Sequence, residues 1–353
     1  MYAKNDHDSP LIGRVVRNSN SLKVNSRRNY STLKNKIDEH FAQINPWFIT
    51  GFTDAEGSFM CNMIKKPKYK AGWEIQPVFQ IKLHVKDFPV ILGIQHSLGN
   101  IGTVENSQST CNFRVRKLKE IIELIKFFDK YPLITRKKGD YLLFKQIVSI
   151  IQLKEHLTTE GLQRIINLKA TLNFGLSKEL QLMFPETIPV ARPLREPCVI
   201  PNPQWISGFT SGEGNFSVSL DIGIYKSLLF KITQHEKDEV LLIAIKDYLN
   251  CGYCYLRKKE NTIDFKVTKF SDITEIIIPF FINNPILGVK SLDFKDWCLV
   301  SEIVKKREHK LASLREAGLR PADPRGGQPP LRLEENIIKI KEIQKGMNRG
   351  RSF

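Results

Sequence analysis

Two stretches of the chain alternate apolar and polar residues with a period of two, the pattern of a strand with one buried face. The first stretch begins at Ser58 and the second at Asn215, and each is followed by another alternating stretch. The residues predicted to face the core are Phe59, Cys61, Met63, Phe79, Ile81, Leu83, Phe216, Val218, Leu220, Phe230 and Ile232. The residues predicted to face outward are Ser58, Met60, Asn62, Gln76, Val78, Gln80, Lys82, Asn215, Ser217, Ser219, Asp221, Ser227, Leu229, Lys231 and Thr233. These patterns predict two antiparallel sheets, each with one open, largely polar face.

A short helix is predicted directly before each first strand. Asn45 and Asn202 suit the N-cap position, and each is followed by a proline, which suits the first helical position. Each helix is expected to stop after about three turns, at Gly57 or Gly214, where glycine can adopt the left-handed cap conformation.

The chain contains an internal repeat. Residues 45–59 read NPWFITGFTDAEGSF and residues 202–216 read NPQWISGFTSGEGNF, 157 positions later. Three further pairs follow in the same order: FQIKLHVKD with FKITQHEKD, FRVRKLKEII with FKVTKFSDIT, and YPLITRKKGDY with NPILGVKSLDF. A period near 150 residues is too long for a solenoid. The repeat therefore predicts an α+β fold of two pseudo-symmetric αββαββα halves, related like the subunits of a homodimer.

The composition divides the chain into four parts. They are a basic, flexible N-terminal extension at 1–44, a first half at 45–184, a proline-rich linker at 185–201, and a second half at 202–353 that contains an inserted loop near 318–330. Residues 11–36 carry seven basic residues and no acidic one, a composition similar to that of a mitochondrial presequence. A disordered basic arm, or sequence carried from an upstream reading frame, is the alternative.

Charge and cysteine content narrow the function classes. The 353 residues include 54 Lys and Arg against 37 Asp and Glu, a net charge of +17, which indicates a polyanionic partner such as nucleic acid. No apolar run reaches the roughly 18 residues of a membrane helix, so we expect no membrane partner. Cys251 and Cys254 form one C-x-x-C pair without a matching second pair, so ordinary packing at a turn is favoured over zinc.

The two glutamates of the repeat are the candidate catalytic or metal-binding residues. Glu56 and Glu213 occupy the last turn of their predicted helices, where the helix dipole disfavours a carboxylate. Gly51 and Gly208 lie mid-helix and would let the two helices pack side by side. The carboxylates would then face each other and either share a proton or bind a cation, for which Mg²⁺ suits oxygen ligands best.

The segments ITGFTDAEG (49–57) and ISGFTSGEG (206–214) resemble the two LAGLIDADG motifs of single-chain homing endonucleases, which are encoded in mobile introns of fungal and other organellar genomes. The resemblance covers about residues 45–353 and is closest to the monomeric fungal mitochondrial group. It implies that the motif helices pack at the interface of the two halves. The two antiparallel sheets would then form a saddle over DNA.

The resemblance also implies the site residues. Glu56 and Glu213 would bind the metal, joined by the backbone carbonyls of Ala55 and Gly212. Asp54 has Ser211 as its counterpart, so we interpret it as a capping or packing residue rather than a metal ligand. Lys117 and Lys269 occupy equivalent places in the repeat and are our candidates for basic residues near the reacting phosphate. Ordinary phosphate contact, or a solvated lysine, is the alternative for both.

The implied function is that of a mitochondrial, Mg²⁺-dependent endonuclease in which Mn²⁺ or Ca²⁺ can occupy the same sites. It would act as a monomer on double-stranded DNA, cut both strands across the minor groove, leave 3′ overhangs and promote intron mobility. The outward residues differ between the halves, so the target should be asymmetric. Two alternatives are an RNA maturase that assists splicing of its group I intron, and a non-cleaving DNA-binding protein on the same scaffold.

Overall fold

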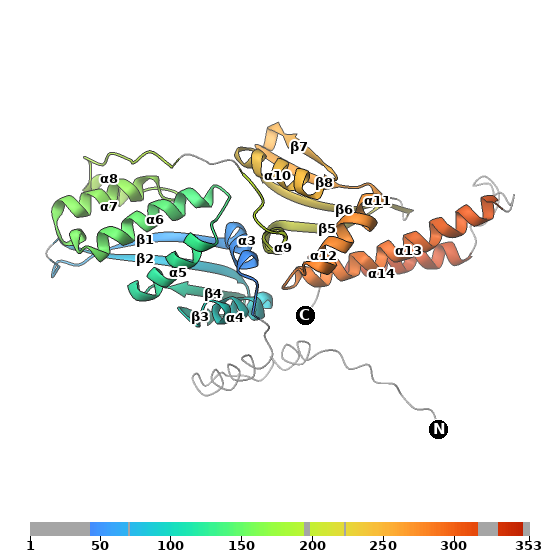
Figure 1. Cartoon of the computed structure of the whole chain (residues 1–353), viewed down its shortest axis with the longest axis horizontal. Helices are drawn as coiled ribbons and strands as arrows, with labels where there is room; N and C mark the ends of the chain where they lie inside the picture. Colours follow the sequence, from blue (N-terminus) through green and yellow to red (C-terminus); the bar gives the residue numbers. More distant parts are fainter. Residues whose placement is uncertain (1–42, 70, 194–197, 222–223, 317–330, 349–353) are drawn as a thin grey trace, which may run out of the picture.

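The fold consists of two similar halves that meet at a pair of helices, in a computed structural model that describes residues 43–69, 71–193, 198–221, 224–316 and 331–348 (Figure 1). The first half contains α3 (Pro46–Glu56), β1 (Gly57–Lys65), β2 (Trp73–His84), η1 (Val85–Asp87), α4 (Phe88–Ser97), β3 (Thr103–Asn106), β4 (Thr110–Val115), α5 (Leu118–Lys130), α6 (Lys137–Gln152), η2 (Glu155–Leu157), α7 (Thr159–Thr171) and α8 (Lys178–Met183). The second half contains α9 (Pro203–Glu213), β5 (Gly214–Asp221), β6 (Ile224–His235), η3 (Glu236–Asp238), α10 (Glu239–Leu249), β7 (Tyr253–Arg257), η4 (Lys258–Glu260), β8 (Thr262–Val267), α11 (Phe270–Asp272), η5 (Ile273–Ile277), α12 (Ile278–Asn283), α13 (Lys290–Glu316) and α14 (Leu331–Gly346). The predicted αββαββα order is confirmed in both halves.

Each half has one antiparallel sheet of four strands. The strand orders are β1-β2-β4-β3 and β5-β6-β8-β7, so the first two strands of each half form a hairpin and the later pair adds to its second strand. The register joins Phe59 to Phe79 and Phe216 to Phe230, and all four side chains are fully buried. Since side chains alternate along a strand, this register places the polar sets together on the opposite face.

An aromatic cluster fills the space between each sheet and its helices. Phe59 packs against Phe128 of α5 and Phe144 of α6, with ring centroids 5.7 Å and 5.4 Å away. Its counterpart Phe216 packs in the same way against Phe281 of α12 and Trp297 of α13. Burying large rings on one face of a sheet provides most of the hydrophobic stabilisation of such a layer. Among the described residues, no helix covers the opposite face of either sheet (Figure 1).

The ends of the two central helices are partly as predicted. Asn45 and Asn202 cap them, each accepting a hydrogen bond at 2.9 Å from the backbone N–H two residues on. Gly57 and Gly214, in contrast, do not adopt the left-handed conformation, because both have φ near −70° and already belong to the following strand. Glycine is needed there for space, since a Cβ at Gly57 would lie 2.6 Å from Cγ2 of Thr53.

The described part of the 185–201 linker contains no helix or strand, and it passes between the halves (Figure 1). Ile44, which we had assigned to the N-terminal extension, is buried in the core of the first half. Residues 1–42 of that extension and the 318–330 loop lie outside the described residues. Among the described helices, none combines the length and apolar character that crossing a membrane requires.

Candidate active site

The interface between the halves is a direct backbone contact of α3 with α9. A Cβ added to Gly51 would lie 2.0 Å from the carbonyl oxygen of Trp205, and one added to Gly208 would lie 2.0 Å from that of Phe48. No side chain fits at either position, so the mid-helix glycines permit the close approach that the sequence suggested. Figure 1 shows the two helices at the centre of the molecule, with their ends leading into β1 and β5.

Asp54 is buried and fully occupied by hydrogen bonds that join the two halves. Its carboxylate accepts from the indole of Trp205 at 2.9 Å, from the backbone of Ile134 at 3.0 Å, and from the hydroxyl of Thr135 at 2.6 Å. Burial raises the pKa of Asp54, and these hydrogen bonds counteract that rise. Its counterpart Ser211 accepts one hydrogen bond, from the backbone of Leu287 at 3.1 Å. Asp54 is therefore a packing residue.

Glu56 and Glu213 are brought together where α3 and α9 end. Burial raises the pKa of Glu56, and repulsion from Glu213 raises it further. Desolvation by the surrounding protein also raises the pKa of Glu213, opposed by a hydrogen bond from Gln234. Glu56 is half-buried and Glu213 is exposed, so the pair opens to solvent on one side. The two carboxylates are thus close enough for the charge of Glu213 to act on Glu56.

Two lysines that were not predicted from the sequence, Lys137 and Lys290, lie near Glu56 and Glu213. Lys137 and Lys290 are the first residues of α6 and α13, and both are among the charges that act on the two glutamates. Lys137 donates to the carbonyl oxygens of Thr53 at 3.0 Å and Ala55 at 3.2 Å. Lys290 donates to the carbonyl oxygen of Gly212 at 2.5 Å. Burial lowers the pKa of each lysine, while the neighbouring carboxylates raise it.

Lys117 and Lys269, our candidates from the sequence, lie elsewhere. Each is the residue before a helix, is more than two-thirds exposed, and pairs with an acid three positions on, Glu120 or Asp272. Neither is among the charges that act on the glutamates, so the described structure brings Lys137 and Lys290, rather than Lys117 and Lys269, beside the pair. The repeat could have identified Lys137 and Lys290, because they occupy the same position in the repeated segments YPLITRKKGDY and NPILGVKSLDF.

The donor set suits a hard divalent cation. Glu56, Glu213 and the carbonyls of Ala55 and Gly212 offer only oxygen, and the carboxylate of Glu56 lies over Gly212, where an added Cβ would be 3.2 Å from its Oε1. No closed site of three or more His, Cys, Asp or Glu side chains exists among the described residues. An ion held here would therefore share its coordination with water or a bound phosphate.

The open faces of the sheets hold most of the predicted outward residues. Side chains of the outward set are exposed or half-buried, with two exceptions: Val78 is buried, and the side chain of Asp221 lies outside the described residues. Val78 stands opposite Met60 in the register, and a short side chain mid-sheet is easily covered by longer neighbours. Asn215 donates to Asn348 at 3.2 Å beyond the end of α14, so its amide already has a partner.

The same faces carry polar clusters that were not predicted, because the sequence pattern was used to assign inward and outward residues for only the first two strands of each half. In the first half, Arg114 of β4 bonds both Gln80 and Glu105, and Gln80 bonds Asn112. In the second half, Asp264 of β8 pairs with Arg257 and Lys266, 3.1 and 3.0 Å away. The two halves thus present different fixed arrangements of donors and acceptors.

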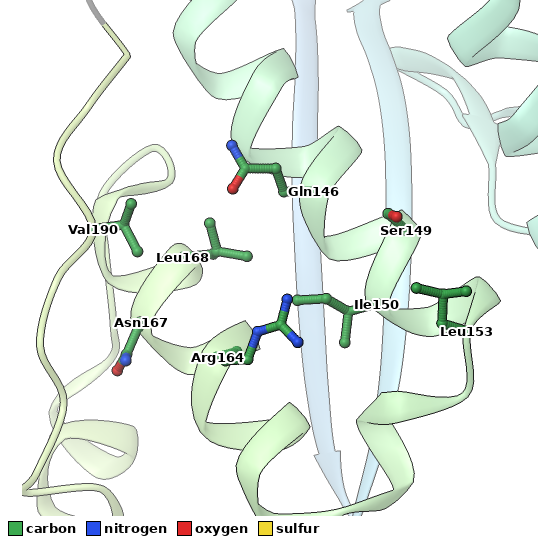
Figure 2. Close-up of a pocket in the computed structure, with 8 residues that line it drawn as sticks. All are labelled: Gln146, Ser149, Ile150, Leu153, Arg164, Asn167, Leu168 and Val190. Atoms are coloured by element: carbon green, nitrogen blue, oxygen red, sulfur yellow. The ribbon is translucent and has the colours of Figure 1, made fainter.

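A pocket of about 260 Å³ lies apart from this site, between α6, α7 and the linker (Figure 2). Gln146, Arg164 and Val190 are among the residues that line it. It contains no catalytic carboxylate, so the candidate active site is the open junction of the halves rather than this pocket.

Comparisons with known proteins agree with this geometry. The LAGLIDADG endonuclease family profile matches residues 49–148 and 206–301. Two proteins from Neurospora crassa, "Probable intron-encoded endonuclease 2" and "Probable intron-encoded endonuclease 3", are 40% and 36% identical over 92% and 82% of this chain. These alignments span 73% and 56% of the two relatives.

Solved structures give the same result. The LAGLIDADG homing endonuclease I-SmaMI, bound to cleaved DNA, superposes with a TM-score of 0.78 at 36% identity, covering 88% of this chain and 99% of its own. I-GzeII in complex with its DNA target has a TM-score of 0.77 at 39% identity, covering 88% and 100%. The chain belongs to the LAGLIDADG endonuclease family.

Proposed function

We propose that this protein is a homing endonuclease that hydrolyses both strands of a long, asymmetric DNA target and leaves 3′ overhangs. One observation carries the proposal: Glu56, Glu213, Lys137 and Lys290 converge at the junction of two open sheet faces. A chain with net charge +17 is suited to bind a polyanion across that junction.

A divalent ion is part of the proposal, and the oxygen donors described above fit it. Held by Glu56 and Glu213 with the carbonyls of Ala55 and Gly212, it would supply Lewis acidity and an acidified water. Mg²⁺ is the expected ion, and Mn²⁺ or Ca²⁺ would use the same donors. Each carboxylate would serve one DNA strand, which accounts for the presence of two.

Lys137 and Lys290 have a different role. Each ammonium is held beside the carboxylates by backbone carbonyls, so it is already oriented before DNA binds. Negative charge develops on the phosphate oxygens during hydrolysis, and a preorganised cation stabilises that charge without further rearrangement. We assign the two lysines this electrostatic role, one on each side of the junction.

The open sheet faces would read the target sequence. A two-stranded ribbon fits the major groove and presents alternate side chains to the base edges. The arginine, lysine, asparagine and glutamine side chains on these faces are of the types that make base-specific hydrogen bonds. Because Asn112 in one half corresponds to Asp264 in the other, the two half-sites should differ.

The names of the relatives support a proposal for the biological setting. Their names mark them as intron-encoded fungal proteins, and we propose that this chain promotes mobility of a mitochondrial intron. We propose that it acts as a monomer, since both motifs lie in one chain and already pack together. A role in splicing of the intron RNA is an outcome that the experiment below distinguishes.

The central test is cleavage of a plasmid that carries the fused exon junction of the host gene. Glu56→Gln and Glu213→Gln should keep DNA affinity within about threefold but reduce double-strand cleavage by at least about 10³-fold, because an amide no longer offers an anionic ligand. Glu123→Gln, which alters an exposed residue paired with Lys126, is the matched control and should cut normally. Full cutting by either active-site variant refutes the assignment.

The same assay separates the alternatives. Cleavage that requires added Mg²⁺ supports the endonuclease. Binding of the junction with no cleavage in Mg²⁺ or Mn²⁺ would identify a non-cleaving DNA-binding protein. Stimulated splicing of the intron transcript without DNA cleavage would identify a maturase.

A further inference from the structure

Asp87 belongs to the first half but holds a turn of the second. It ends the η1 turn after β2, and its Oδ1 accepts a hydrogen bond of 2.7 Å from the backbone N–H of Val289. Val289 immediately precedes Lys290. The neighbouring Gly288 has φ +77°, and a Cβ there would lie 2.4 Å from the same oxygen. The turn that leads into α13 is therefore packed directly on the carboxylate of Asp87.

The charge of Asp87 acts on the same site. Asp87 is among the acids whose charge acts on Lys290. On this side of the junction Lys290 donates to the carbonyl oxygen of Gly212, and the carboxylate of Glu56 lies over Gly212.

The acids that act on the two lysines can be compared. Both are influenced by the glutamate pair and by an acid three positions on in their own helix, Asp140 or Asp293. Lys137 has Asp54 in addition, whereas Lys290 has Asp87. The counterpart of Asp54 is Ser211, which carries no charge.

We propose that Asp87 is a positioning residue for Lys290, acting from the opposite half through the turn at Gly288 and Val289. The inference rests on the proposed endonuclease function. Loss of Asp87 should impair one DNA strand and leave the other almost unaffected.

The test is single-turnover cleavage of a target labelled separately on each strand, with the full-length chain and Mg²⁺. Asp87→Ala should slow one strand by about tenfold or more, the same strand that Lys290→Met slows, and change the other by less than about twofold. Asp87→Asn keeps an oxygen that can accept the Val289 N–H but removes the charge, so its effect should be intermediate. DNA affinity should stay within about twofold for all variants.

A double-mutant cycle distinguishes positioning from a general structural role. If Asp87 acts through Lys290, Asp87→Asn combined with Lys290→Met should cut no more slowly than Lys290→Met alone. Combined with Lys137→Met, the same substitution should have an additive effect. Equal slowing of both strands, a parallel loss of DNA affinity, or additivity with Lys290→Met would overturn the proposal.

Hydrogen exchange tests the contact without any cleavage. In the DNA-free protein, Asp87→Ala should speed exchange of the Val289 amide by roughly tenfold, while the Thr135 amide, which bonds Asp54, stays protected. An unchanged Val289 amide overturns the inference. If the wild-type chain cuts no DNA, the proposed function fails, and this measurement still decides whether Asp87 holds the turn.

Discussion

At the scale of single residues, two acids in the same motif have opposite surroundings. The oxygens of Asp54 accept from Trp205, Ile134 and Thr135, so little acceptor capacity is left for another ligand. Glu56 lies two residues further on, at the helix end, beside a second carboxylate. The buried acid joins the halves, and the acid at the open end remains available for chemistry.

The position of Glu56 beside a second carboxylate predicts that the stability of the DNA-free protein depends on pH. The folded pKa of Glu56 is above its ordinary value of 4.5, so the folded state keeps a proton that the unfolded chain releases as pH rises past 4.5. The free energy of unfolding should fall from there through the raised pKa. Glu56→Gln should therefore raise the melting temperature at neutral pH and flatten its decline above pH 4.5. A steeper decline in the variant would contradict the argument.

The lysines give a second prediction at this scale. Lys137→Met and Lys290→Met should each slow cleavage by about 10²-fold with little change in DNA affinity, because each removes a preorganised cation beside the reacting phosphate. Lys117→Met and Lys269→Met, which break only exposed pairs with Glu120 and Asp272, should change the rate by less than about threefold. Single-turnover cleavage rates check this prediction. A larger loss of rate in Lys117→Met and Lys269→Met would favour those two lysines instead.

The proximity of the two glutamates was predicted from the sequence and that of Lys137 and Lys290 was not, for a physical reason. A carboxylate repeated at the unfavourable end of two helices is visible in the sequence alone. A lysine at a helix N-terminus is also unfavourable, but its proximity to Glu56 depends on how α6 packs on β1 and on α3. That packing is set by aromatic contacts such as Phe59 with Phe144, which the strand pattern does not specify.

At the scale of elements, the contact of α3 with α9 leaves no room for a side chain at Gly51. Gly51→Ala would place a Cβ 2.0 Å from the carbonyl oxygen of Trp205, which only a backbone shift can relieve. The substitution should cost about 3 kcal/mol or more, since overpacking against backbone cannot relax through rotamers. It should also lower cleavage, because the helices carry both glutamates.

Gly346→Ala is the matched control for this prediction. Gly346 ends α14, and a Cβ there meets nothing within 4 Å, so alanine should be neutral or slightly stabilising. Chemical denaturation of both variants measures the difference. Equal stability of Gly51→Ala and the wild-type protein would mean that the helices do not pack as closely as the structure shows.

Predictions of which strand residues face the core were correct where a periodic pattern supported them. Strand alternation correctly placed Phe216 and Phe230 in the core and Lys231 on the open face. It failed for Val78, because periodicity assigns a face of the sheet but not the covering by neighbours. It also failed for the conformation of Gly57, where a close contact with Thr53 rather than a left-handed cap requires glycine.

At the scale of the whole molecule, the duplication is symmetric in backbone but not in surface chemistry. Arg114 and Lys266 occupy equivalent places on β4 and β8, yet Arg114 bonds Gln80 and Glu105 while Lys266 pairs with Asp264. Fixed side chains of different type favour different bases, since recognition depends on matching donors to acceptors. One molecule of the chain should therefore bind its target in a single orientation.

Binding-site selection from a randomised DNA library tests this expectation. The wild-type protein should select an asymmetric sequence. Arg114→Ala should relax the preference in one half-site, and Lys266→Ala should relax it in the other, each at a cost of about 1–3 kcal/mol for the preferred base. Lys126→Ala, on α5 and paired with Glu123, should leave the selected sequence unchanged. A perfect palindrome, or loss of preference in both half-sites from either substitution, would mean that the two sheets do not read the DNA separately.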